Sequence, residues 1–178
     1  MVYSACTFNR VDNVKFWLNE FPDWNLEARN SVVGGHALGL AVYAGPNRFK
    51  LTSYLLEKGA DPDTLTFGGS SILHSACSNR DADPAVLELL LSSCKHLLDY
   101  RRQPRTLKWK IIYSVARIAW NINGMMLFLS REVGATALHH AALHGDMELV
   151  EILLSEGADP SLRNDIGQDT AAMCNSFP

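Results

Sequence analysis

Three histidines stand close together in the sequence, at His139, His140 and His144. On a helix, His140 and His144 lie one turn apart, and two imidazoles at this spacing can bind zinc. A zinc site needs further ligands, and no cysteine or acidic residue stands at a spacing that would supply them. We therefore expect no metal site in this segment.

Other residue patterns with known chemistry are also incomplete. Asp81 and Asp83 could contact calcium, but the surrounding segment has too few oxygen ligands for a calcium loop. The glycine pairs at 34–35 and 68–69 do not continue into a phosphate-binding pattern. No nucleophile elbow, zinc-protease motif or paired Cys/His nucleophile is present. The sequence therefore predicts a protein that is not an enzyme and needs no cofactor.

Basic residues are concentrated between residues 95 and 117, where seven basic residues accompany one acidic residue. This segment has a charge of +6, whereas the remainder, with nine basic and 18 acidic residues, has a charge of −9. The basic patch consists of Arg101, Arg102, Arg105, Lys108 and Lys110. Three interpretations stay open: a solvated loop without a ligand, a docking site for an acidic protein segment, or a site for the phosphates of nucleic acid or anionic lipid. The acidic remainder argues against nucleic acid as the partner.

The elements that position these residues are clearest near the C-terminus. The pattern that starts at Gly134 restarts at Gly167. Between these glycines, apolar residues at 147, 149, 150, 153 and 154 have the period of an amphipathic helix. Asp146 can cap the start of this helix, and Gly157 can end it in the left-handed conformation.

This pattern resembles the ankyrin repeat, in which a turn and two antiparallel helices recur about every 33 residues. The resemblance implies an all-α solenoid of stacked helix-turn-helix units with short β-hairpin-like turns. A small residue recurs in the first helix of each unit, at Ala5, Ala41, Ala76, Ala116, Ala141 and Cys174. We therefore expect one ankyrin-repeat domain over residues 1–178, with approximate repeats 1–33, 34–67, 68–101, 102–132, 133–166 and a partial copy at 167–178.

The fourth of these repeats is irregular. The spacing from Ala76 to Ala116 is longer than in the other repeats, and the spacing from Ala116 to Ala141 is shorter. We expect a helix from Leu107 to Trp120 whose apolar residues face a core. Those residues are Ile111, Ile112, Val115, Ala116 and Ala119. The connection that follows is short, which predicts that the projecting turn between repeats, here called the finger, is missing between Arg131 and Gly134.

The resemblance also implies that the chain recognises another protein through the first-helix face and the finger tips. By register, the candidate partner-binding residues are Tyr43, Phe67, Ser70, Ser78, Asn79, Leu143, His144, Arg163, Asp165 and Gln168. Tyr43 and Phe67 are the strongest candidates, because aromatic side chains dominate binding hot spots. His74 and His139 match the histidine of the repeat and are expected to stabilise its turn. The alternative is a regulatory module of a larger enzyme or channel.

Composition is that of a folded protein, with 47% apolar and 20% charged residues. The four cysteines, Cys6, Cys77, Cys94 and Cys174, are expected to be free thiols in a reducing compartment. No signal-peptide pattern is present, and charged residues interrupt the most apolar window, 107–129. We therefore expect a soluble protein of the cytoplasm, with the nucleus as an alternative. Both ends fall inside repeats, so the sequence is expected to be a piece of a longer protein.

Overall fold

The computed structural model describes residues 2–31, 34–43, 45–79, 81–119 and 121–175, so Trp120 lies outside the described residues. Most helices form antiparallel pairs of an inner and an outer helix. These pairs are α1 (Val2–Thr7) with α2 (Val11–Glu20), α3 (Ala37–Tyr43) with α4 (Arg48–Glu57), α5 (Ile72–Cys77) with α6 (Pro84–Cys94), and α9 (Ala137–His144) with α10 (Met147–Ser155). The short η1 (Lys95–Leu97) follows α6, and α11 (Thr170–Cys174) is the last helix. A separate hairpin consists of α7 (Leu107–Ile118) and α8 (Gly124–Glu132).

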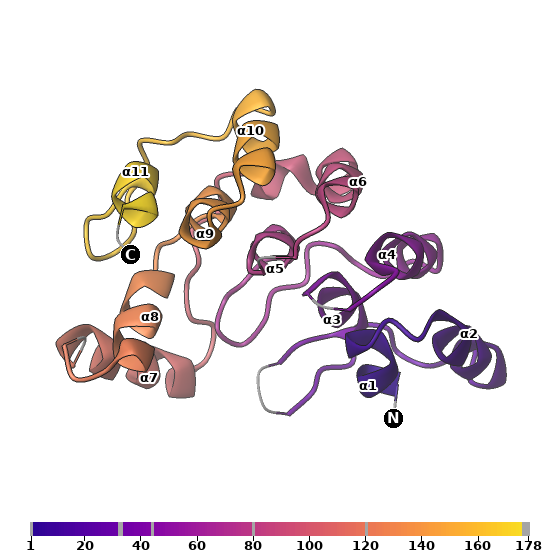
Figure 1. Ribbon diagram of the computed structural model, residues 1–178. Coiled ribbons are helices and arrows are strands. Elements are labelled where there is room, and N and C mark those ends of the chain that lie inside the picture. Colours follow the sequence, from indigo (N-terminus) through magenta and orange to yellow (C-terminus); the bar gives the residue numbers. More distant parts are fainter. Residues whose placement is uncertain (1, 32–33, 44, 80, 120, 176–178) are drawn as a thin grey trace.

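The paired helices stack into a solenoid. Along the inner side, α1 packs on α3, α3 on α5, α5 on α9, and α9 on α11. Along the outer side, α4 packs on α6 and α6 on α10. Figure 1 shows the inner helices following one another through the molecule, with the outer helices along one side of them. The described residues contain helices and no strand, which confirms the predicted all-α solenoid of stacked helix pairs.

Small residues allow the inner helices to approach closely. Ala41 and Ala141 have no exposed surface, and Ala76 is 5% exposed. The outer helices contribute leucines to the same core, and Leu55, Leu90 and Leu153 are all fully buried. A larger side chain at the alanine positions would collide with the neighbouring repeat, because protein interiors are close-packed.

Polar side chains fix where the helices begin. Asp146 accepts a hydrogen bond from the Leu149 amide at the start of α10, as the sequence predicted. Thr136 caps α9 and Ser71 caps α5 in the same way. At the end of α10, Gly157 has a φ of +98°, the left-handed conformation that glycine adopts most easily. The predicted cap and the predicted glycine at the end of this helix are therefore confirmed.

Backbone hydrogen bonds close the fingers that follow α4, η1 and α10, here called the second, third and fourth fingers, at corresponding positions. The Thr66 amide donates to the Ser70 carbonyl at 3.0 Å in the second finger, and the Asn164 amide donates to Gln168 at 2.9 Å in the fourth. In the third finger, the Arg102 amide donates to Ala135 at 2.8 Å. Only two residues separate Asn164 from Gly167, whereas the whole segment 103–133 separates Arg102 from Gly134. The α7–α8 hairpin is therefore an insertion at the tip of the third finger.

The prediction of an irregular fourth repeat at 102–132 was consequently wrong. Helix α5 packs directly against α9, so no repeat separates them, and α7 packs against α8 instead. The finger that was predicted to be missing is present, although the hairpin divides it. The interval from Ala76 to Ala141 holds one repeat and an inserted hairpin, rather than two repeats.

The predicted core residues of α7 are only partly buried. Ala116 is fully buried, but Ile111 is 55% exposed and Val115 is 50% exposed. Helix α7 has α8 on one side, and Trp109 and Tyr113 lie near Gly68 of the second finger. Leu107 and Ile118, on the same side of α7 as Ile111 and Val115, are 72% and 83% exposed. A helix inside the stack would have had its second apolar face covered by the next repeat.

Candidate protein-interaction surface

Residues at two adjacent register positions, at or just beyond the ends of the inner helices, form a continuous row. Tyr43, Ser78 and Leu143 each follow the buried alanine of their helix by two residues, and Asn79 and His144 follow by three. Because α3, α5 and α9 pack in succession, these five residues lie along one side of the stack. The Asn79 side-chain amide donates to the Tyr43 carbonyl at 3.1 Å. We call this set the inner-helix row.

One further residue extends the row. Phe8 follows Ala5 by three residues, the same spacing that places Asn79 and His144, and α1 packs against α3. Phe8 is 63% exposed, and Tyr43 is 47% exposed. Sequence reasoning missed Phe8, although its distance from Ala5 was sufficient to find it. The N-terminal end of the row therefore presents two exposed aromatic rings.

Buried histidines hold the inner helices to the fingers. His74 Nδ1 lies 2.7 Å from Ser71 Oγ, and His74 Nε2 lies 2.9 Å from the Ala135 carbonyl oxygen. Burial lowers the pKa of His74 to about 3, so the ring is neutral, donating through Nε2 and accepting at Nδ1. His139 makes the equivalent contacts in α9. These contacts agree with the predicted structural role of both histidines.

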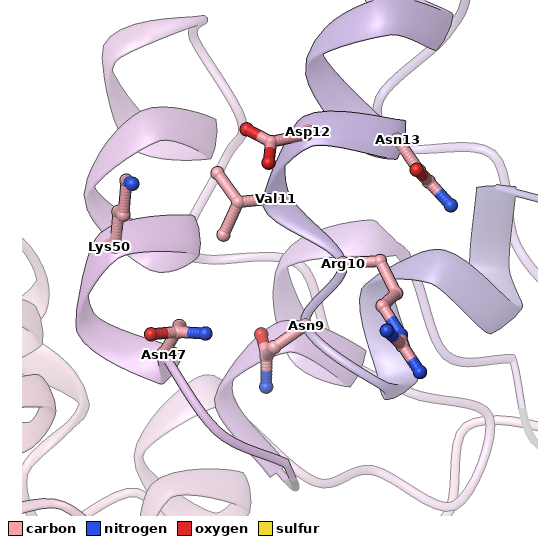
Figure 2. Close-up of a pocket in the computed structure, with 7 residues that line it drawn as sticks. All are labelled: Asn9, Arg10, Val11, Asp12, Asn13, Asn47 and Lys50. Atoms are coloured by element: carbon pink, nitrogen blue, oxygen red, sulfur yellow. The ribbon is translucent and has the colours of Figure 1, made fainter.

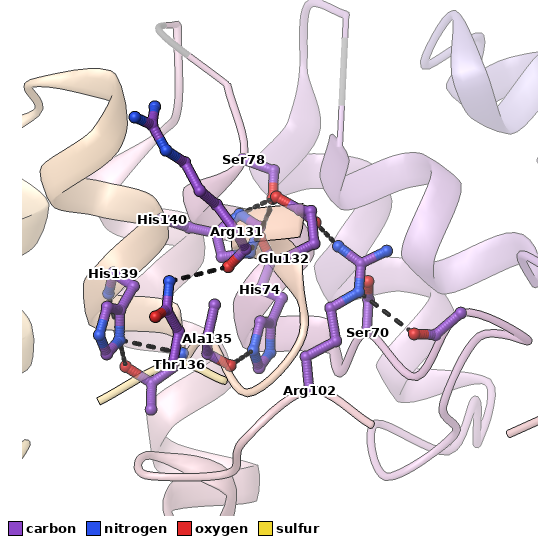
Figure 3. A network of polar contacts seen from close by, with 12 residues as sticks. Ser70, His74, Ser78, Arg102, Arg131, Glu132, Ala135, Thr136, His139 and His140 are labelled. Atoms are coloured by element: carbon purple, nitrogen blue, oxygen red, sulfur yellow. Dashed lines mark hydrogen bonds and ion pairs between the residues drawn. The ribbon is translucent and has the colours of Figure 1, made fainter. Parts of the chain in front are cut away.

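A polar network joins the inserted hairpin to the stack (Figure 3). Glu132, at the end of α8, is 2% exposed and forms an ion pair with Arg102. The Arg102 Nε donates to the Gly68 carbonyl in the second finger at 3.2 Å. The buried His140 ring has Nδ1 2.8 Å from Ser78 Oγ and Nε2 3.7 Å from Glu132 Oε1. Burial holds the pKa of His140 well below its usual value.

The finger residues predicted to bind a partner lie on both sides of the insertion. Phe67 is half-buried in the second finger, with the Arg29 guanidinium 5.7 Å from its ring centroid. In the fourth finger, Asp165 forms an ion pair with Arg101 at 3.1 Å. Arg163 has a 66% exposed side chain and lies 3.7 Å from the Asp169 carboxylate. Ser70 and Gln168 are half-buried at the ends of the second and fourth fingers. The backbone carbonyl of each accepts a hydrogen bond from an amide of the same finger.

The predicted basic patch divides into two groups. Arg102 is largely buried in its ion pair with Glu132, and Arg101 contacts Asp165, so both stabilise the base of the hairpin. Arg105, Lys108 and Lys110 remain exposed. The charge pattern alone could not separate the two groups, because the partner carboxylates are distant in the sequence.

Two hollows lie at the N-terminal end of the stack. One has a volume of about 280 Å³ and lies between the α1–α2 turn and the start of α4 (Figure 2). Its charged residues, Arg10, Asp12 and Lys50, have mixed signs, so it does not point to a charged ligand. The other, of about 510 Å³, is mainly apolar and is lined by Val2, Ser4, Ala5, Phe8, Arg10, Asn13, Phe16, Trp17 and Phe21. It adds apolar surface beside Phe8.

Within the described residues, no three His, Cys, Asp or Glu side chains are grouped so that they could hold a metal ion. All four cysteines are free, and Cys6, Cys77 and Cys94 are buried. Burial raises the pKa of Cys6 to about 12, which makes its thiol a poor nucleophile. No helix in the described parts of the chain is long and apolar enough to cross a membrane.

Comparison with known proteins agrees with the repeat architecture. Residues 133–165 match the family described as Ankyrin repeat, and residues 40–91 match Ankyrin repeats (many copies). NF-kappa-B inhibitor alpha from Sus scrofa is 31% identical over 113 residues, which are 64% of this chain and 28% of that protein. Probable E3 ubiquitin-protein ligase XBOS32 from Oryza sativa subsp. japonica is 24% identical over 163 residues, which are 74% of this chain and 33% of that protein. The chain thus spans a third or less of either relative.

Proposed function

Because the chain belongs to the ankyrin-repeat family, we propose that it binds a partner protein through the inner-helix row and Phe8, and that it does so without catalysis. Ankyrin repeats are protein-interaction modules, and each repeat adds a similar set of side chains to an extended surface. The neighbouring finger residues Phe67, Ser70, Arg163, Asp165 and Gln168 form the rim of the proposed surface.

The observation that carries this proposal is the unbroken inner-helix row. Because α5 packs directly on α9, Asn79, just after α5, and His144, the last residue of α9, lie at the ends of adjacent helices without a degenerate repeat between them. Exposed aromatic rings at Phe8 and Tyr43 supply anchors, and the polar Ser78 and Asn79 supply directional contacts. Interfaces commonly combine aromatic anchors with a more polar surround.

Site-specific photo-crosslinking in cells tests which face is used. A photoreactive amino acid replaces Tyr43 or Leu143 in the row, or Glu88 or Glu151 as exposed controls on the outer helices. We expect one discrete protein to be crosslinked from positions 43 and 143 and not from 88 or 151. Crosslinks of equal yield from both faces, or none from the row, would contradict the proposal.

The affinities of substituted variants for the crosslinked protein then test which residues contribute to binding. Tyr43→Ala is expected to weaken binding by about tenfold or more, because exposed aromatic residues at an interface centre often contribute that much. Met147→Ala is the matched control, because Met147 is an exposed apolar residue on the outer helix α10. Equal affinities for the two variants would remove Tyr43 from the interface.

The partner segment can also belong to the same polypeptide. The chain covers only 28% and 33% of the two relatives, and one of these is a probable ubiquitin ligase. A regulatory module of a larger protein would use the same inner-helix row, and the crosslinks would then be intramolecular. The free cysteines support a reducing compartment such as the cytoplasm as the place of binding.

A further inference from the structure

Helix α7 presents an apolar stripe that the fold leaves uncovered. Leu107, Ile111, Val115 and Ile118 are 72%, 55%, 50% and 83% exposed, respectively. Their spacing of i, i+4, i+8 and i+11 places them on one face of the helix. The opposite face buries Tyr113 and Ala116. A contiguous group of this kind usually marks an interaction site, whereas single exposed apolar residues do not.

Exposed apolar residues continue around the turn of the hairpin. Ile122 is 72% exposed, and Met125 and Phe128 of α8 are 63% and 37% exposed. The apolar surface therefore extends beyond one helix face and includes the tip of the hairpin. A groove shaped for a single helix would leave this second part uncovered, whereas a flat surface could contact both parts.

Positive charge surrounds the stripe. No aspartate or glutamate occurs between Asp99 and Glu132. At about 100° per residue, Lys108 lies on one side of the stripe, and Lys110 and Arg117 lie on the other. Lys108 and Lys110 are exposed, and the Arg117 side chain is 50% exposed although it lies 3.9 Å from an Asp165 oxygen. Two copies of this surface would therefore repel one another.

The base of the hairpin is held by the fingers on both sides. On one side, the Arg105 amide donates to the Phe67 carbonyl at 3.0 Å. On the other side, the Asp165 amide donates to the Val133 carbonyl at 2.9 Å, and the Asn164 side-chain amide donates to Arg131 at 3.2 Å. Figure 1 shows α7 and α8 projecting away from the stacked helices. The stripe is thus presented on a support that is fixed at its base and projects from the stack.

We propose that the α7–α8 hairpin docks on an anionic lipid surface, with the apolar stripe at the acyl boundary and the flanking cations among the phosphates. A basic helix with an exposed apolar face binds membranes in this orientation without crossing them. Lysine and arginine side chains can extend from the edges of the stripe to the headgroups. Nucleic acid would contact the cations but would gain nothing from the aliphatic stripe. The inference is independent of the proposed protein recognition.

Flotation with vesicles tests the proposal on the full chain. The probes are phosphatidylcholine vesicles with and without phosphatidylserine, at low and high salt. The wild type is expected to float with the anionic vesicles only, and to bind less at high salt. The double variants Ile111→Ser/Ile118→Ser and Lys108→Glu/Lys110→Glu are each expected to reduce binding by about tenfold or more. Circular dichroism and urea unfolding check that both variants remain folded.

Matched controls carry the same chemistry on other surfaces. Met147→Ser removes an exposed apolar residue from α10, and Lys50→Glu/Lys58→Glu reverses two exposed charges at α4. Both controls are expected to bind vesicles as the wild type does. Absence of phosphatidylserine-dependent binding by the wild type would overturn the proposal, as would equal losses in the controls. Loss of binding in the charge variant alone would also overturn it, because the stripe would then have no role.

An environment-sensitive dye reports whether the stripe reaches the acyl boundary. The dye is attached to Ile118→Cys, or to Met147→Cys as the control, after the exposed Cys174 has been changed to serine. A blue shift on adding anionic vesicles is expected at position 118 and not at position 147. If position 118 instead crosslinks to a protein while vesicles cause no shift, the occupant is a protein and the lipid proposal is wrong.

Discussion

Helices α10 and α7 share a local sequence pattern but have opposite surroundings. Both begin with a side-chain cap and have apolar residues at the helical period. In α10 the apolar residues Leu149 and Leu153 are fully buried, whereas in α7 Ile111 and Ile118 are 55% and 83% exposed. The difference arises from neighbours, because α10 packs on α9 and α6, while α7 packs on α8. The local sequence pattern therefore specifies that a helix forms. Whether the apolar face of that helix is covered depends on its position relative to the repeats.

The largest loss of stability is expected from a substitution at the point where the α7–α8 hairpin joins the stack. Arg102→Met leaves the buried Glu132 carboxylate without its ion-pair partner, and we expect a loss of about 3 to 5 kcal/mol in the free energy of unfolding. Arg105→Met is the control, because Arg105 is exposed nearby, and its effect should stay within about 0.5 kcal/mol. Urea denaturation measures both. Similar values for the two variants would show that the network does not hold the hairpin to the stack.

Truncating one apolar side chain in α10 and one in α7 measures how much more burial stabilises the first helix than the second. Leu153→Ala removes fully buried atoms from α10 and should cost about 2 to 5 kcal/mol. Ile118→Ala removes mostly exposed atoms from α7 and should cost about 0.5 kcal/mol or less. The measurement is the free energy of unfolding in urea. If Ile118→Ala cost as much as Leu153→Ala, another part of the molecule would have to cover the stripe.

Acid should weaken the stack through its buried histidines. The pKa of His74 is about 3 in the folded state and about 6.5 in the unfolded chain. Between these values the unfolded state binds a proton that the folded state does not. Stability is therefore complete above pH 6.5 and declines as the pH falls, by about 1.4 kcal/mol per pH unit for each such histidine. Urea unfolding at pH 7.5 and 5.5 measures this decline.

A variant identifies the source of the pH dependence. His74→Asn removes one titrating group, so the decline between pH 7.5 and 5.5 should become smaller even though the variant is less stable overall. His140, whose pKa is also held well below its usual value by burial, should account for much of the remainder. A wild-type stability that stayed flat over this range would contradict the burial of these rings. The α7–α8 hairpin contains no histidine and should respond only through the stack.

The stack of helix pairs could be predicted from the repeat period, because particular residues in each repeat fix the local structure. The alanine positions, the Asp146 cap and Gly157 each specify a local conformation that does not depend on distant residues. The inner-helix row followed from the same register. The insertion did not, because Ala116 within an apolar pattern is equally compatible with a repeat and with a free hairpin. The sequence signal for an insertion was the long interval from Ala76 to Ala141. The prediction interpreted that interval as two repeats instead of one repeat with an inserted hairpin.

The polar contacts of the candidate interaction surface and of the base of the hairpin could not be predicted from the sequence. Arg101, Arg102 and Arg105 look equivalent in a basic segment, yet Arg102 pairs with Glu132 and Arg101 with Asp165. Those partners lie far along the chain, so only the folded protein distinguishes the arginines. Likewise, contact between Ser78 and His140 requires α5 to pack on α9, which the predicted fourth repeat would have prevented.

Removal of the whole hairpin is expected to change stability only slightly, and it is the sharpest test of the comparison. Replacing residues 103–133 by two residues would give the third finger the length of the fourth, in which two residues separate Asn164 from Gly167. The deletion removes Glu132, so Arg102→Met is included in the same variant to avoid leaving a buried guanidinium unpaired. The contacts of α5 with α9 and of α6 with α10 remain, and the free energy of unfolding should then change by about 1 kcal/mol or less. Circular dichroism and urea unfolding measure the outcome, and binding to the crosslinked protein partner should persist while vesicle binding is lost. If the shortened chain unfolds in two transitions or fails to fold, the hairpin is an integral part of the solenoid, as a repeat would be.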